Sequence, residues 1–149
     1  MLYGSVCLVE IIFNFICMGN VMAVDKTMHI LVVDDYNTMR RIIKNLLKQL
    51  GFDNVDEAAD GSEAFKKLQE KPAGLVISDW NMEPMTGLEL LKLVRAHEKL
   101  KNTPFIMVTA ESKPENVIAA KQAGVSNYIV KPFNAETLKT KMMSVIGEF

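Results

Sequence analysis

The segment LVISDWNMEPMTGLELL, residues 75–91, decides the fold of this chain. Its first four residues, LVIS, have the length and apolar character of a strand that is buried on both faces. Asp79 ends this run, and the residues that follow it favour a turn, after which an apolar helical pattern begins at Leu88. The segment therefore predicts a central parallel strand with a carboxylate at its carboxyl end, which is the edge where open α/β sheets bind ligands.

The same alternation of short apolar runs and helical patterns continues through most of the chain. Further strands are predicted at residues 28–33, 55–59, 105–108 and 128–130. Helices are predicted at about residues 39–50, 61–70, 88–99, 114–123 and 135–146, two of them closed by Gly51 and Gly124. Five strands that alternate with five helices predict an α/β fold, a doubly wound five-stranded parallel sheet.

The composition is that of one globular domain. The chain has 149 residues, of which 49% are hydrophobic and 23% charged, and this is enough apolar material for a core. The net charge of −1 argues against a broad nucleic-acid surface. Both cysteines, Cys7 and Cys17, lie near the start. The remainder therefore has neither a disulfide framework nor a cysteine metal site, which fits a reducing, cytoplasmic compartment.

Residues 1–21 form a separate apolar segment without lysine or arginine. Three interpretations are open: upstream sequence read through from an incorrect start, an interfacial or membrane anchor, and an export signal. The first is preferred, because Glu10 and Asn14 interrupt the apolar run and no basic residue precedes it. We assign residues 1–27 to an N-terminal extension outside the fold and residues 28–149 to the folded domain, and we do not expect membrane association.

Right-handed crossovers place the carboxyl ends of all parallel strands at one edge of the sheet. Polar residues at the ends of separate strands are therefore expected to meet there. These residues are Asp34, Asp35, Asp79, Thr109 and Lys131. Each alone has an ordinary explanation as a helix cap, a turn former or a solvated side chain. Their joint placement favours a functional site.

Three carboxylates that meet at one point repel each other unless a cation lies among them. With oxygen ligands only, the suitable ion is hard: Mg²⁺, or Mn²⁺ in its place. The candidate ligands are Asp35 and Asp79 directly, Asp34 through water, and the backbone carbonyl of Asn81. A carboxylate beside Mg²⁺ can also attack phosphorus and form an aspartyl phosphate. Lys131 and Thr109 could then contact the phosphoryl oxygens.

These motifs together resemble the receiver domain of two-component response regulators. The matching residues are the pair Asp34-Asp35, Asp79, Thr109 and the run Lys131-Pro132-Phe133. The segment after Asp79, together with Tyr128, is similar to that of CheY-like chemotaxis proteins, and the resemblance covers about residues 28–146. It implies the flavodoxin-like, CheY-like form of the doubly wound fold.

The resemblance also implies a role for each matching residue. Asp79 would accept a phosphoryl group from a histidine kinase, next to Mg²⁺ held by Asp34, Asp35, Asp79 and the Asn81 carbonyl. Lys131 would contact the phosphoryl group, and the Lys131–Pro132 peptide bond would be cis. Thr109 and Tyr128 would be the switch residues. The residues that would tune dephosphorylation are Asn81 and Glu111.

Three functions are compatible with this site. The preferred one is a monomeric, stand-alone response regulator that signals by phosphorylation-dependent docking, with the flagellar motor switch as its target. The alternative is a phosphate sink or phosphorelay shuttle without a motor target. A third is a Mg²⁺ phosphohydrolase, but Asn81 stands where such an enzyme would place a second catalytic aspartate. We therefore expect a phosphoacceptor protein that catalyses only its own phosphotransfer and dephosphorylation, and not an enzyme acting on other substrates.

Overall fold

The computed structural model describes residues 24–110 and 113–149 and has the predicted α/β architecture. Strands and helices alternate along the chain without exception in this part. In chain order they are β1 (Ile30–Val33), α2 (Asn37–Gln49), β2 (Val55–Ala58), α3 (Gly61–Glu70), β3 (Leu75–Asp79), α4 (Gly87–Ala96), β4 (Phe105–Thr109), α5 (Pro114–Gln122), β5 (Asn127–Val130) and α6 (Ala135–Ile146). The prediction of five strands and five helices is confirmed.

The five strands form one parallel sheet in the order β2-β1-β3-β4-β5. Its register aligns the strand ends that matter for function. Val33, the last residue of β1, is paired with Ser78, and Thr109, the last residue of β4, is paired with Val130. Residues that follow β1, β3, β4 and β5 therefore emerge at the same edge of the sheet.

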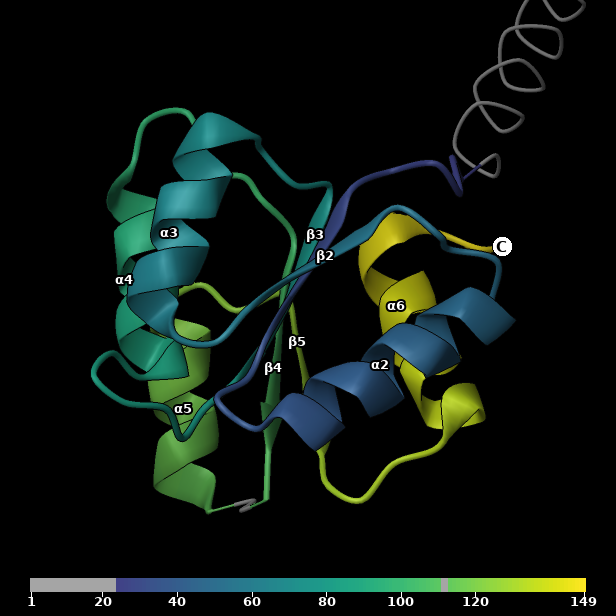
Figure 1. Ribbon diagram of the computed structural model, residues 1–149. Helices are drawn as coiled ribbons and strands as arrows, with labels where there is room; N and C mark the ends of the chain where they lie inside the picture. Colours follow the sequence, from purple (N-terminus) through teal and green to yellow (C-terminus); the bar gives the residue numbers. More distant parts are fainter. Residues whose placement is uncertain (1–23, 111–112) are drawn as a thin grey trace, which may run out of the picture.

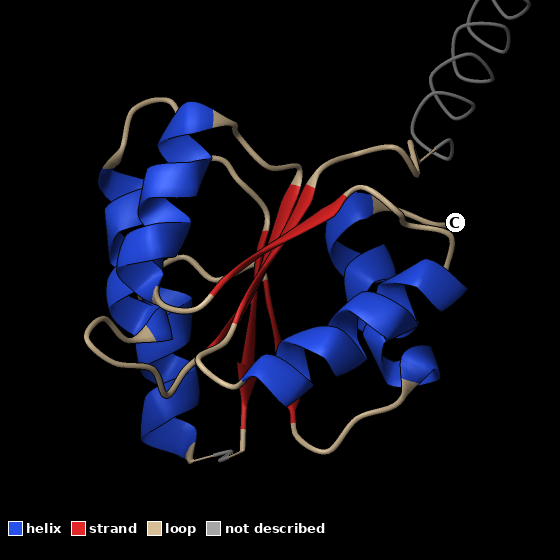
Figure 2. Cartoon of the chain, viewed as in Figure 1, coloured by secondary structure: helices blue, strands red, loops and turns tan. Residues whose placement is uncertain are grey.

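Helices cover both faces of the sheet, which gives three layers (Figure 1). Helices α2 and α6 lie on one side, and α3, α4 and α5 lie on the other, as the blue helices flanking the red strands in Figure 2 show. Because side chains alternate along a strand, Ile30 and Val32 of β1 belong to the core beside α2 and α6, whereas Leu31 and Val33 belong to the opposite core. All four are fully buried, as predicted for a strand covered on both faces.

Two helices end where glycine was predicted to end them. Gly51 and Gly124 have φ angles of 97° and 92°, which L residues rarely adopt and glycine adopts readily. The predicted end of α4 near residue 99 was wrong, because the helix stops at Ala96. His97 turns to an extended conformation, and its carbonyl accepts hydrogen bonds from the backbone N–H groups of the separate turn that follows.

The two described ends of the chain lie together at the amino edge of the sheet. Val24 and Phe149 both pack against the core beside α2 and α6. The Phe149 ring meets Phe52 edge to face at 4.9 Å, and the Lys26 ammonium lies 5.6 Å from the Phe149 centroid. The predicted extension comprises residues 1–27, of which residues 1–23 lie outside the described part and Val24 packs against the core. The boundary between extension and domain therefore stays a prediction. Among the described residues, no helix has the length and apolar character needed to cross a membrane.

Candidate functional site

The carboxyl edge of the sheet brings three aspartates together. Asp34 and Asp35 follow β1, and Asp79 is the last residue of β3. Each offers a carboxylate oxygen, and these three oxygens lie within 4.8 Å of one another. Asp34 and Asp79 are almost fully buried, with exposed fractions of 1% and 7%, whereas Asp35 is exposed. Residues that are 45 positions apart in the chain thus form one acidic cluster, as their positions after separate strands predicted.

Lys131, which follows β5, supplies a positive charge to this cluster. Its Nζ lies 3.1 Å from Asp79 Oδ1 and 3.5 Å from Asp34 Oδ2. The Lys131 backbone N–H donates to the Thr109 carbonyl at 2.7 Å, which fixes the end of β5 against the end of β4. The Lys131–Pro132 peptide bond is cis, as the resemblance implied. One ammonium therefore serves two buried carboxylates.

This single cation does not compensate the cost of burying both acids. Burial raises the pKa of the Asp34 carboxyl, although the Tyr36 backbone N–H and Lys131 act in the opposite direction. Burial also raises the pKa of the Asp79 carboxyl, and the nearby charge of Asp34 raises it further, against the lowering effect of Lys131. The ionised cluster is thus electrostatically strained, and a further cation would relieve the strain.

The chain after β1 is held in place by two polar contacts. The Tyr36 backbone N–H donates to Asp34 Oδ1 at 2.8 Å, which fixes the Asp34 carboxylate. Arg40 of α2 reaches back and donates from Nη1 to the Asp34 carbonyl at 2.6 Å. Arg40 was not among the site residues predicted from the sequence, so this contact was missed. The available signal was its position one helical turn after Tyr36, the N-cap residue of α2.

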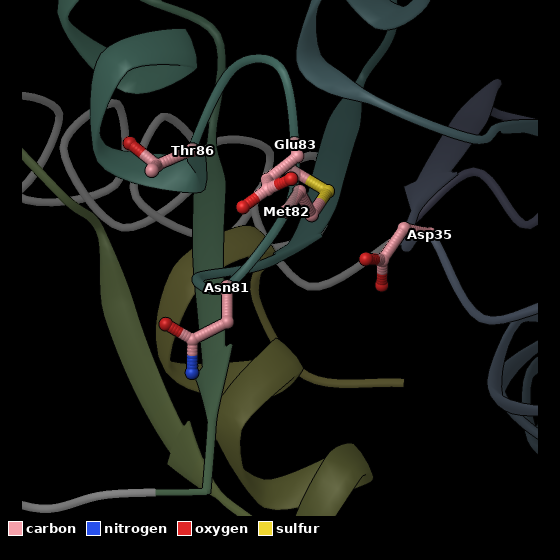
Figure 3. Close-up of a pocket in the computed structure, with 5 residues that line it drawn as sticks. All are labelled: Asp35, Asn81, Met82, Glu83 and Thr86. Carbon is pink, nitrogen blue, oxygen red and sulfur yellow. The ribbon is translucent and has the colours of Figure 1, made fainter.

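The turn after β3 forms an open pocket of about 370 Å³ beside the acids. Figure 3 shows Asp35 on one side of this pocket and the turn that carries Asn81, Met82 and Glu83 on the other. Thr86, the N-cap residue of α4, completes its lining. Asn81 thus lines the same pocket as Asp35, and its role as a carbonyl ligand stays a prediction. Glu83, which the sequence suggested only as a turn residue, brings another carboxylate to the pocket.

The two predicted switch residues lie on neighbouring strands. Thr109 ends β4 and is buried, with an exposed fraction of 2%. Tyr128 lies on β5 opposite Met107 of β4, half-buried, and packs against the core beside α3 and α4. Glu111, predicted to tune dephosphorylation, lies outside the described residues.

The acidic cluster fits a hard divalent cation by its chemistry. Its donors are the carboxylate oxygens of three aspartates, and the carboxyl groups of Asp34 and Asp79 are buried and have raised pKa values. A bound cation would therefore offset the charge repulsion that Lys131 leaves uncompensated. Oxygen donors of this kind suit Mg²⁺, Mn²⁺ or Ca²⁺ better than softer metals. The cluster can therefore hold a metal ion.

Comparison with known sequences identifies relatives across most of this chain. Residues 30–143 match the family described as the response regulator receiver domain. The chemotaxis protein CheY-3 of Vibrio cholerae is 55% identical over 118 residues, which are 79% of this chain and 91% of that protein. The chemotaxis protein CheY of Pseudomonas aeruginosa is 53% identical over 118 residues, which are 79% of this chain and 95% of that protein.

Solved structures agree with the sequence relatives. The chemotaxis response regulator CheY4 of Vibrio cholerae superimposes with a TM-score of 0.74 at 40% identity, covering 80% of this chain and 99% of that one. The signal receiver domain of a signal transduction histidine kinase from Syntrophus aciditrophicus gives a TM-score of 0.71 at 28% identity, covering 76% of this chain and 86% of that one.

Proposed function

Because this chain belongs to the response regulator receiver domain family and is CheY-like, we propose that it is a chemotaxis signalling protein phosphorylated on Asp79. The observation that carries this proposal is the position of Asp79. Its carboxylate ends the central strand, lies 3.1 Å from the Lys131 ammonium, and shares a small volume with Asp34 and Asp35. No packing requirement explains two nearly buried acids at this position.

The phosphodonor is a phosphohistidine of a histidine kinase. An Asp79 carboxylate oxygen attacks phosphorus, the phosphorus–nitrogen bond breaks, and its electron pair stays on the imidazole, so an acyl phosphate forms. Lys131, already in contact with Asp79, then pairs with the phosphoryl oxygens. Mg²⁺ held by the three aspartates and the Asn81 carbonyl would supply positive charge to those oxygens when bound.

The output is protein docking. Thr109, at the end of β4, would donate its hydroxyl to a phosphoryl oxygen, and Tyr128 on the adjacent strand would change its packing in response. Strand β5 and helix α5 each expose a large apolar side chain nearby, Val130 at 41% and Ile118 at 54%. A partner such as the flagellar motor switch would bind this surface when its shape changes.

Intact-mass measurement tests the phosphoacceptor. After incubation with acetyl phosphate and Mg²⁺, the protein is expected to gain the mass of one phosphoryl group, and Asp79→Asn is expected to gain none. The matched control is Asp53→Asn, a change of an exposed aspartate at the other edge of the sheet, which should leave the gain intact. A phosphoryl group retained in Asp79→Asn would refute the assignment.

Binding to a motor-switch peptide tests the output. The affinity of the protein for the peptide is expected to rise when beryllofluoride, a mimic of the phosphoryl group, is bound. A partner that prefers one conformation binds more tightly when that conformation is more populated. Equal affinity in both states would remove the docking function and favour a phosphate sink.

A further inference from the structure

The two adjacent acids of the site are restrained very differently. The Asp34 carboxylate accepts hydrogen bonds from the Tyr36 N–H at 2.8 Å and from Lys131 at 3.5 Å. The Asp34 backbone N–H donates to the Ala58 carbonyl at 3.2 Å. Asp35 is exposed, and within the described ranges no hydrogen bond or ion pair holds its carboxylate. The backbone therefore sets the Cα–Cβ direction from which the Asp35 carboxylate extends.

Arg40 contacts that backbone directly. Its Nη1 donates to the Asp34 carbonyl oxygen at 2.6 Å. This oxygen belongs to the planar peptide group that joins Asp34 to Asp35, so holding the oxygen fixes the plane from which the Asp35 side chain departs. A rotation of this plane would move the Asp35 carboxylate away from Asp34 and Asp79.

The guanidinium of Arg40 is itself braced from β2. Its Nε donates to Glu57 Oε1 at 3.2 Å, and Lys44 Nζ donates to Glu57 Oε2 at 2.8 Å. Only 13% of the Arg40 side chain is exposed. A guanidinium is planar and presents its donors in fixed directions. Engagement of Nε by Glu57 therefore sets the direction in which Nη1 points.

We propose that Arg40 is a positioning residue for the metal site, which holds the Asp34–Asp35 peptide through a Glu57-braced guanidinium and so aims Asp35 at the cation. This inference rests on the proposed function, because it assumes that the acidic cluster binds Mg²⁺. It assigns a role in cation binding to a helix residue and a β2 residue that contribute no metal ligand.

Direct measurement of cation affinity tests this role. Mn²⁺ stands in for Mg²⁺, and the loss of its free-ion electron paramagnetic resonance signal reports binding without requiring phosphorylation. Removal of a residue that orients a metal ligand typically weakens binding by about 10-fold or more, and we expect that for Arg40→Gln. Arg40→Lys keeps the charge but cannot reach Glu57 and the Asp34 carbonyl in the same geometry, so it should weaken binding by a similar factor. Glu57→Gln removes the brace but keeps Arg40, so it should weaken binding by less than Arg40→Gln does.

Arg41→Gln is the matched control, because Arg41 is the next residue of α2, is exposed, and loses the same charge. It should bind Mn²⁺ within a factor of about two of the original chain. Urea midpoints without metal separate a loss of affinity from a loss of folding. If Arg40→Gln fails to fold, Arg40→Lys and Glu57→Gln carry the test.

Each outcome bears on the proposal. An Arg40→Lys protein that binds as tightly as the original chain would show that charge alone matters and would overturn the positioning role. Equal weakening in Arg40→Gln and Arg41→Gln would overturn it as well. If the original chain binds no Mn²⁺, both this inference and the proposed metal site fail, whereas normal binding by the original chain and by all Arg40 variants refutes the inference alone.

Discussion

Replacing Gly87 with alanine should displace the backbone of Asp79 and so disturb the acidic cluster. Gly87 is the first residue of α4, and an added Cβ would lie 2.1 Å from the Asp79 carbonyl oxygen and 2.9 Å from Met107 Sδ. Such contacts are essentially never below 3.0 Å, so the backbone of Asp79 or of α4 must move by about 0.9 Å. Strand β3 is hydrogen-bonded on both sides, and the Gly87 N–H donates to the Trp80 carbonyl at 2.9 Å, so neither part can move freely.

We expect Gly87→Ala to lower the free energy of unfolding by about 3 kcal/mol, the upper range for forcing extra volume into a packed interior. Phosphorylation by acetyl phosphate should slow by a factor on the order of 100, because a displacement near 1 Å of a reacting group has an effect of this size. Urea unfolding followed by far-UV circular dichroism measures the first quantity, and intact mass against time measures the second.

Gly61→Ala is the matched control. Gly61 is also a buried first residue of a helix, α3, and the atoms nearest to its added Cβ would be Met85 Cγ and Sδ at 2.8 Å and Met85 Cβ at 2.9 Å, none of them in the backbone. Rotation of the Met85 side chain can move its Cγ and Sδ away, and the contact with its Cβ needs a shift of only about 0.1 Å to reach 3.0 Å. Alanine also favours the helix by up to about 1 kcal/mol over glycine. The net change in stability should be less than about 1 kcal/mol. Equal effects of the two substitutions, or a fully active Gly87→Ala protein, would refute the reasoning.

Three further predictions concern the charges of the site. Lys131→Met should lower the free energy of unfolding at pH 7 by about 2 kcal/mol, because it leaves Asp34 and Asp79 buried without their counter-charge. Adding Asp79→Asn to this variant should restore much of the loss, and urea titration of the single and double variants measures both changes. The raised pKa values of Asp34 and Asp79 mean that the folded, metal-free protein binds protons more tightly than the unfolded chain. Their contribution to stability therefore increases as the pH falls from 7 and is complete below the ordinary aspartate pKa of about 3.9. Asp79→Asn should be more stable than the original chain at pH 7 and lose that advantage near pH 4. A difference in urea midpoint between the two proteins that stays constant from pH 7 to pH 4 would contradict the linkage. Mg²⁺ at about 100 times its dissociation constant should raise the free energy of unfolding by about 2.7 kcal/mol, and Asp35→Asn should remove most of this increase in a thermal melt with and without the ion.

The strands and the acidic edge were predictable because their signals are local. Short apolar runs end just before Asp34, Asp79 and Lys131. Because crossovers between parallel strands are almost always right-handed, these strand ends can be placed at one edge of the sheet without knowing any contact between them. The periodic helices were predictable for the same reason, since one apolar face was enough to identify α2 and α3.

Features that depend on contacts between distant residues were not predictable in this way. The sequence after Ala96 still favours a helix, yet the helix ends there. The His97 carbonyl instead accepts hydrogen bonds from the backbone N–H groups of a separate turn. In the sequence, nothing distinguishes Arg40 from Arg41, the next basic residue of α2. The function-related contacts of Arg40 depend on the position of Glu57 on β2, which is 17 residues away in the chain and comes near only through the packing of α2 on the sheet.

The packing of Val24 and Phe149 at the amino edge has a practical consequence for experiments on this molecule. The four residues of β1 extend about 13 Å, so these two positions and the acidic cluster lie on opposite rims of the sheet. A surface tether or a fluorophore attached beside either residue would stay clear of an incoming phosphodonor. Single-molecule or biosensor measurements of phosphotransfer can therefore be built on these two positions without rebuilding the reactive rim.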